Sequence, residues 1–200
     1  MPDLFDLPFP QYRCRSCGKD LPLNDARLSV TCAEHQDTPR IEFSVREATS
    51  ADRHSIEEIC DRALGETDVD VYGKTFDVLS GVNVVAESDG NLAGLLSLAV
   101  EGGGLAIVLL SVYPDFQGQG VGRALLAEAD SIAAARRLPC LRAAVSNDDI
   151  PQLYFYQRHG FHIEEIAVGA VADQLGSAVA GFSGIPVRDE IRLRRAVCSA

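Results

Sequence analysis

The sequence predicts an α/β fold, a mixed sheet flanked by helices, over residues 41–200, preceded by a small module over residues 1–40. From Ile41 onward, apolar runs that alternate as strands do are interleaved with segments whose apolar residues recur at helical spacing. Up to Arg40, the chain has too few apolar residues for a core of its own but carries closely spaced cysteines. The two parts therefore need different sources of stability.

Start and stop signals divide the larger part into elements. Thr49 or Ser50 can cap the first helix, Gly81 can close the second, and Pro139 stops the helix that follows a glycine-rich stretch. In order, we expect a strand over 41–48, helices over 49–64 and 70–81, strands over 82–88, 92–100 and 105–114, a helix over 120–136, a strand over 140–146, a helix over 147–160, and strands over 161–169 and 189–197.

The composition restricts the partners. The net charge of -11 disfavours nucleic acid, because phosphate binding depends on Lys and Arg, and gives a weak indication of a cationic partner such as an amine. A solvated acidic surface explains the same charge. Apolar runs such as 105–112 are much shorter than the roughly 20 residues of a membrane span. Residues 1–15 lack the features of a secretory signal, so we expect a cytoplasmic protein without a membrane segment.

The first forty residues carry a candidate zinc site. Cys14 and Cys17 form a CxxC pair, and Cys32 and His35 form a CxxH pair. Thiolate and imidazole are the ligands that tetrahedral zinc prefers, and all four ligand positions are filled by protein, so the expected Zn²⁺ is structural. A disulfide or a tail with incidental cysteines is the alternative. This zinc-ribbon-like module could bind a protein partner.

A glycine-rich stretch joins a predicted strand to a predicted helix. Gly118, Gly120 and Gly122 stand at every second position, directly before good helix formers. Such a turn at a helix N-terminus is suited to phosphate, because free N–H groups point at the anion and glycine allows close approach. The spacing matches neither GxGxxG nor a P-loop, which disfavours a dinucleotide or ATP fold.

The spacing Gln117-x-x-Gly120-x-Gly122 resembles the signature of the GNAT acetyltransferase superfamily. The blocks "SVYPDFQGQGVGRALL" and "VSNDDIPQLYFYQRHGF" are similar to that family's strand-loop-helix block and to its second block, and the likeness extends over residues 41–197. The resemblance implies a mostly antiparallel mixed sheet and a loop that holds the pyrophosphate of acetyl-CoA.

The resemblance also implies site residues. It assigns the acid that protonates the departing CoA thiolate to Tyr156, a role that a phenol can fill, although simple helix packing is the alternative. It places a backbone N–H that binds the thioester carbonyl near Ser111 and Val112. Asn147 either caps a helix or contacts the pantetheine arm. The implied cofactor-binding set is Ser111, Val112, Gln117, Gly118, Gln119, Gly120, Val121, Gly122, Arg123 and Asn147.

Two functions follow from these residues. The first is an acetyl-CoA-dependent N-acetyltransferase, an acyltransferase that moves the acetyl group to a small-molecule or peptide amine by direct attack in a ternary complex. The second is a non-catalytic acetyl-CoA-binding module that docks on a protein through the zinc segment. Neither the acceptor nor the general base can be identified from the sequence, and Glu87, Glu101 and Ser111 are candidates for the base. A homodimer remains open.

Overall fold

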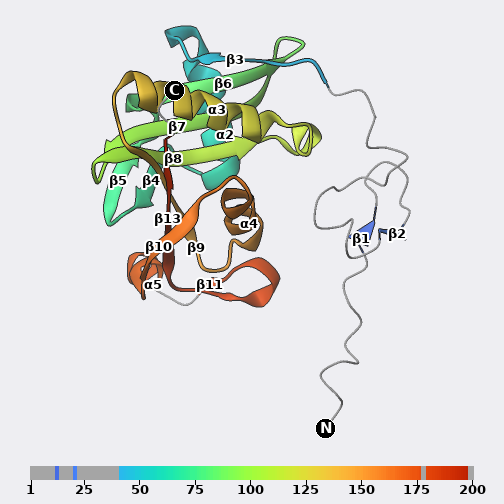
Figure 1. Ribbon diagram of the computed structural model, residues 1–200. Helices are drawn as coiled ribbons and strands as arrows, with labels where there is room; N and C mark the ends of the chain where they lie inside the picture. Colours follow the sequence, from blue (N-terminus) through green and yellow to red (C-terminus); the bar gives the residue numbers. More distant parts are fainter. Residues whose placement is uncertain (1–11, 14–19, 22–40, 177–178, 198–200) are drawn as a thin grey trace. The chain divides into compact units, whose positions relative to one another are not determined.

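The computed structural model describes residues 12–13, 20–21, 41–176 and 179–197, and the chain divides into two compact units, Met1–Glu42 and Phe43–Ala200 (Figure 1). In the first unit, β1 (Tyr12–Arg13) pairs antiparallel with β2 (Asp20–Leu21). The candidate zinc ligands Cys14, Cys17, Cys32 and His35 lie outside the described residues, so the zinc site remains a prediction.

The second unit is built on a seven-stranded sheet in the order β10-β13-β9-β8-β7-β6-β3 (Figure 1). Every neighbouring pair in it is antiparallel except β8 and β9. The predicted mixed, mostly antiparallel sheet is therefore confirmed. Its strands are β3 (Ser44–Glu47), β6 (Val82–Ser88), β7 (Asn91–Glu101), β8 (Gly104–Val112), β9 (Cys140–Ser146), β10 (His162–Ala167) and β13 (Glu190–Ala196).

Helices cover both faces of this sheet. Ile56 and Ile59 of α2 (Arg53–Leu64) share a buried cluster with Leu95 of β7. A Cβ atom on the neighbouring Gly94 would instead lie 3.2 Å from Val121 in α3 (Val121–Ala135). Because successive strand residues point to opposite faces, α2 and α3 lie on opposite sides, which we call the α2 face and the α3 face. The remaining helices are α4 (Ile150–Arg158), α5 (Ala170–Leu175) and the short 3-10 turns η2 (Ser50–Asp52), η3 (Val78–Ser80), η4 (Pro114–Phe116) and η5 (Phe182–Gly184).

The predicted helix over 70–81 is wrong. The chain instead forms a hairpin of β4 (Asp68–Val71) and β5 (Lys74–Asp77), followed by η3. Tyr72 and Gly73 make the turn with φ angles of 58° and 70°, the pair of positive angles that a two-residue hairpin turn needs. Val69 and Phe76 pack against the α2 cluster from one face of the hairpin. A second small hairpin, β11 (Val179–Ala180) and β12 (Pro186–Val187), precedes β13.

Strands β8 and β9 part halfway along their length. Their parallel pairing joins Leu105–Ile107 to Leu141–Ala143. Among the later residues of the two strands, all of which the structure describes, β8 does not pair with β9. The register of β7 against β8 shifts at the same level, because Ser97 pairs with Leu109 and Leu98 with Ile107, which leaves Val108 as an extra residue in β8. We call the unpaired stretch, Val108–Val112 beside Ala144–Ser146, the β8–β9 split.

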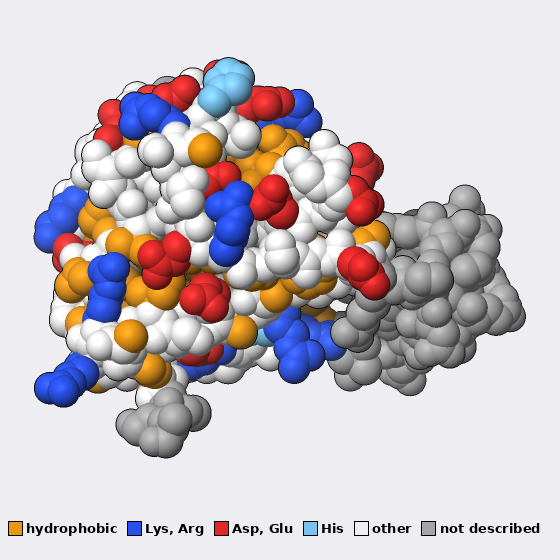
Figure 2. All heavy atoms as spheres, turned by 90° about the horizontal axis from the view of Figure 1, so that it is seen from above, with side chains coloured by type: hydrophobic (Ala, Val, Ile, Leu, Met, Phe, Trp, Pro, Cys, Tyr) orange, Lys and Arg blue, Asp and Glu red, His pale blue; other side chains and the backbone are white. Residues whose placement is uncertain are grey.

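The described surface mixes charges of both signs. Figure 2 shows acidic and basic side chains side by side over one face of the second unit, with apolar side chains between them. Among the described residues, none of the helices is long and apolar enough to cross a membrane.

Candidate active site

The end of β8 directs two backbone amides into the β8–β9 split. The N–H of Tyr113 donates to the carbonyl of Ala93 in β7 at 3.0 Å. Hydrogen-bonded pairs alternate along an antiparallel ladder, so the Ser111 amide also faces β7, while the amides of Leu110 and Val112 face the opposite edge. The Val112 carbonyl on that edge accepts a hydrogen bond from Gln117 Nε2 at 3.0 Å. The amides of Leu110 and Val112 therefore line the split.

The glycine-rich loop ends at the N-terminus of α3, as predicted. Gly118 and Gly120 have φ angles of 78° and 90°, in the left-handed region that favours glycine, with the half-buried Gln119 between them. The Gly120 carbonyl accepts the first helical hydrogen bond, from Ala124. The N–H groups of the first turn, Val121 to Arg123, have no acceptor within a helix. With the positive end of the helix dipole, they form a site for a phosphate group.

Close packing holds this loop against the split. A Cβ atom on Gly122 would lie 3.2 Å from the Phe155 ring of α4 and 3.8 Å from the Val112 side chain. Val121 is buried beneath the loop, and the exposed Arg123 stands at the third helical position. The predicted residues Val112, Gln117, Gly120 and Gly122 are thus neighbours in space as well as in sequence.

Tyr156 is the buried tyrosine of α4. Its side chain is only 2% exposed and packs against Phe155 and Phe161, with ring centroids 5.5 and 5.1 Å away. Burial raises the pKa of the Tyr156 phenol well above its ordinary value, and the nearby Tyr72 and Asp149 raise it further. A phenol in this setting is neutral near pH 7 and still has its proton to donate.

Asn147 does not cap α4, so this alternative is wrong. Its side-chain oxygen accepts hydrogen bonds from the N–H groups of Arg188 and Asp189 at 2.8 and 2.9 Å, and its Nδ2 donates to Pro186. The cap is Asp149, whose carboxylate accepts from the N–H of Gln152. Asn147 instead attaches the segment before β13 to the end of β9, and its predicted pantetheine contact remains a prediction.

Two candidate bases are engaged in ion pairs. Glu87 lies 2.6 Å from Arg46, and Glu101 lies 2.7 Å from Lys74, whose hydrogen bond lowers the pKa of the Glu101 carboxyl. Ser111 pairs with Leu95, so its side chain points to the α2 face. Burial raises the pKa of the Asp149 carboxyl, and Asp149 acts electrostatically on Tyr156. Sequence patterns did not suggest Asp149, because its role as cap conceals its proximity to Tyr156.

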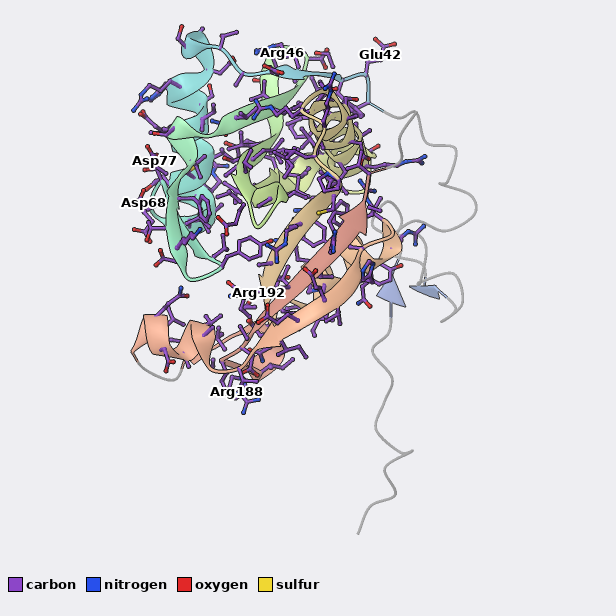
Figure 3. The ribbon with its side chains drawn as sticks, turned by 60° about the vertical axis from the view of Figure 1, so that its left-hand side comes forward. Glu42, Arg46, Asp68, Asp77, Arg188 and Arg192 are labelled. Atoms are coloured by element: carbon purple, nitrogen blue, oxygen red, sulfur yellow. The ribbon has the colours of Figure 1, made fainter. Side chains whose placement is uncertain are left out.

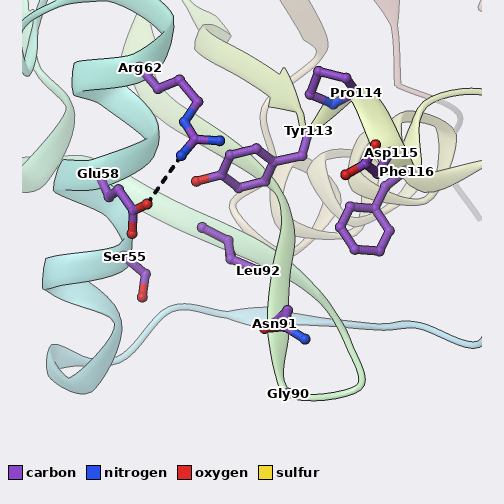
Figure 4. Close-up of a pocket in the computed structure, with 10 residues that line it drawn as sticks. All are labelled: Ser55, Glu58, Arg62, Gly90, Asn91, Leu92, Tyr113, Pro114, Asp115 and Phe116. Carbon is purple, nitrogen blue, oxygen red and sulfur yellow. Dashed lines mark hydrogen bonds and ion pairs between the residues drawn. The ribbon is translucent and has the colours of Figure 1, made fainter.

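A hollow of about 500 Å³ opens between α2, the β6–β7 turn and the residues after β8 (Figure 4). Arg62 lies over the Tyr113 ring, 5.1 Å from its centroid, and 3.4 Å from Glu58. None of the lining residues belongs to the Gln117–Arg123 loop or is Tyr156, so we do not place the cofactor there. The lining residues are Ser55, Glu58, Arg62, Gly90, Asn91, Leu92, Tyr113, Pro114, Asp115 and Phe116.

Comparison with known proteins agrees with this geometry. Residues 80–163, from the last residue of η3 to the start of β10, match the model of the acetyltransferase (GNAT) domain. The fold is similar to that of an IAA acetyltransferase from Bacillus cereus, with a TM-score of 0.62, 22% identity, and coverage of 78% of this chain and 99% of the other. It is also similar to a GNAT family acetyltransferase from Elizabethkingia anophelis with acetyl-CoA bound, with a TM-score of 0.60, 22% identity, and coverage of 77% and 97%. Over residues 80–163 the chain is thus similar to a GNAT acetyltransferase domain, and its fold is similar to the folds of these two solved structures.

A curated relative is similar to part of this chain. The chain is 41% identical over 75 residues to a mycothiol acetyltransferase of Clavibacter michiganensis subsp. michiganensis. The matched stretch is 38% of this chain. The match spans 24% of the length of that relative. The likeness therefore covers less than half of this chain and about a quarter of that relative.

Proposed function

We propose that this chain is an N-acetyltransferase that moves the acetyl group of acetyl-CoA to a primary amine in a ternary complex. One observation carries the proposal: the free amides of β8, the N-terminus of α3 and the buried Tyr156 lie at the same end of the β8–β9 split. The packing of Phe155 against Gly122 and of Gly122 near Val112 brings these three parts together. Acetyl-CoA bound in a structure of similar fold supports the choice of co-substrate.

Each group has a role in the proposed reaction. The loop Gln117–Arg123 and the first turn of α3 bind the pyrophosphate, and the Val112 amide binds the pantetheine arm. The Leu110 N–H binds the thioester oxygen and stabilises the oxyanion that forms there. The ladder geometry favours Leu110 over Ser111 for this hydrogen bond, because the Ser111 amide faces β7.

The chemical step transfers one acyl group. The lone pair of the amine nitrogen attacks the thioester carbon, the C–S bond breaks, and the thiolate takes the proton of the Tyr156 hydroxyl. The nitrogen loses a proton to solvent, and Tyr156 is reprotonated. The half-buried carboxylate of Asp149, at the N-terminus of the same helix, acts electrostatically on Tyr156 and is a candidate for the group that relays the proton from the amine to Tyr156.

Mass spectrometry tests this function. The purified chain is mixed with labelled acetyl-CoA and a pooled panel of spermidine, nourseothricin, amino acids, an alanine-terminated peptide and a mycothiol-related amine. We expect a labelled product with at least one amine, and the same mixture with the Tyr156→Phe variant gives much less of it. Acetyl-CoA binding without any product would favour the non-catalytic binding module.

We also propose that Cys14, Cys17, Cys32 and His35 hold one structural zinc ion, on the strength of their ligand spacing. Elemental analysis of protein purified without chelators is expected to find one zinc per chain. Protein without metal would remove this idea. Docking of a partner through this segment and a homodimer stay predictions.

A further inference from the structure

The tip of the β4–β5 hairpin is fixed to β13, the strand next to the edge strand β10. The backbone N–H of Tyr72 donates to Glu190 Oε2 of β13 at 2.9 Å, a bond between residues that are 118 positions apart. Glu190 is 4% exposed and also accepts from Arg192 Nε at 2.6 Å. Figure 3 shows the hairpin, marked by Asp68 and Asp77, on the side of the sheet where Arg192 lies.

The Tyr72 ring is held between two arginines. The guanidinium of Arg142 lies 5.0 Å from the ring centroid, and that of Arg192 lies 5.6 Å from it. Both arginines are themselves fixed by ion pairs, Arg142 with Glu164 at 3.3 Å and Arg192 with Glu190. The orientation of the Tyr72 ring is therefore set by its surroundings.

The hydroxyl of Tyr72 is not used in the hydrogen bonding of the described fold. It is buried, and it has no hydrogen-bond partner among the described residues. A buried polar group without a partner costs stability, and such groups are rare in native proteins. A phenylalanine would provide the same ring between the same arginines. The hydroxyl therefore calls for a partner that the described part of the chain does not supply.

The position of Tyr72 indicates what that partner is. Arg142 pairs with Ala106, and Ala106 pairs with Ala99, which packs on the α2 cluster, so Arg142 and the ring above it lie on the α2 face. Arg142 precedes Ala143, the last β9 residue paired with β8, so Tyr72 stands where the β8–β9 split begins.

Tyr156 belongs to α4, which contacts α3 through Phe155. The two tyrosines thus approach the split from the two faces of the sheet. Their proximity also appears in the pKa of Tyr156, which burial raises first and Tyr72 second.

We propose that the Tyr72 hydroxyl binds the nitrogen of the acceptor amine, on the side of the β8–β9 split opposite to Tyr156. The inference rests on the proposed acetyl transfer. The hydroxyl oxygen accepts a hydrogen bond from an N–H of the amine, which leaves the nitrogen lone pair directed at the thioester carbon. Tyr72 is an acceptor-binding residue, and Tyr156 is the acid.

The Tyr72→Phe variant tests this assignment, because it removes only an oxygen that the fold does not use. With spermidine, nourseothricin and the alanine-terminated peptide as amine probes, we expect kcat/KM for the acetylated amine to fall roughly tenfold, mainly through KM. The KM for acetyl-CoA is expected to equal that of the wild type. The melting temperature is expected to equal or exceed that of the wild type. Tyr154→Phe is the matched control, since Tyr154 is 50% exposed on α4, and it is expected to behave as wild type.

The outcomes separate the two proposals. If the wild-type chain acetylates an amine and Tyr72→Phe does so with unchanged kinetics, the acceptor-binding role is wrong and the acetyltransferase remains. If Tyr72→Phe weakens acetyl-CoA binding as much as amine binding, the role is also wrong. If the wild-type chain acetylates none of the probes, the proposed function fails and this inference with it.

Discussion

The two sides of the β8–β9 split are built in different ways. The α3 side uses backbone groups from one continuous segment, from Leu110 to Arg123, together with Tyr156. The α2 side uses side chains from three distant segments, with Tyr72 from a hairpin, Arg142 from β9 and Glu190 from β13. The first arrangement depends on local backbone conformation, and the second depends on long-range packing. The two sides should therefore respond differently to substitution.

The largest effect is expected on the α3 side, at Tyr156. Tyr156→Phe keeps the ring packed against Phe161 and removes the proton donor, so we expect kcat to fall by about 100-fold or more while the affinity for acetyl-CoA is nearly unchanged. Single-turnover kinetics and calorimetric titration with acetyl-CoA measure the two quantities. A parallel loss of binding would show that Tyr156 is a packing residue.

On the α2 side, Glu190→Gln should cost stability. The side chain of Arg192 is only 19% exposed and would lose its buried partner, so we expect the free energy of unfolding to fall by about 2–3 kcal/mol. Glu165→Gln is the matched control, because Glu165 pairs with the same arginine at 3.0 Å but is 52% exposed, and it should cost less than about 1 kcal/mol. Urea unfolding measures both, and equal losses would contradict the anchoring role of Glu190.

Glycine geometry allows a matched test of the phosphate loop. Gly120 and Gly65 have φ angles of 90° and 82°, and a Cβ atom on either would meet nothing within 4 Å. Each Gly→Ala substitution should therefore cost a similar 1–2 kcal/mol of stability. We expect only Gly120→Ala to weaken acetyl-CoA binding, by about tenfold, because the added methyl group stands where the phosphate approaches the backbone. Equal affinities in calorimetry would place the phosphates elsewhere.

The smallest effect concerns a pH-dependent tether near the start of α4. Asp148 is 8% exposed and accepts hydrogen bonds from the Ser146 hydroxyl and from the N–H of Phe182 in η5. Burial acts to raise the pKa of the Asp148 carboxyl, but these hydrogen bonds outweigh it, and the pKa lies below its ordinary value of 3.8.

A lowered pKa contributes stability that is present above pH 3.8 and is lost as the pH falls through the folded-state pKa. Asp148→Asn should therefore cost about 1 kcal/mol at pH 7, and its difference from wild type should shrink below about pH 4. Melting temperatures of both proteins at neutral and acid pH measure this. A constant difference would mean that the carboxylate charge does not matter.

The succession of strands and helices from β6 to α4 along the chain, and the position of the glycine-rich loop, could be predicted from the sequence. The segment from β6 to α4 follows the expected elements closely, because alternating apolar residues and glycine positions specify its local conformation. The predicted helix over 70–81 failed because Tyr72 adopts a positive φ angle, which is uncommon for a bulky residue and is stabilised here by Glu190 and two arginines. No pattern within a few residues reveals such a contact.

By itself, the sequence determined the glycine-rich loop, the helix that follows it and the place of Tyr156 in the next helix. These features depend on residues adjacent in the chain, whose backbone angles and hydrogen bonds are largely local. Only the tertiary structure decided that Asn147 binds the segment 186–189, that Leu110 and Val112 face the split, and that Tyr72 stands over Arg142. Those arrangements depend on strand register and on buried charge pairs between distant segments, which form only when the whole sheet is assembled.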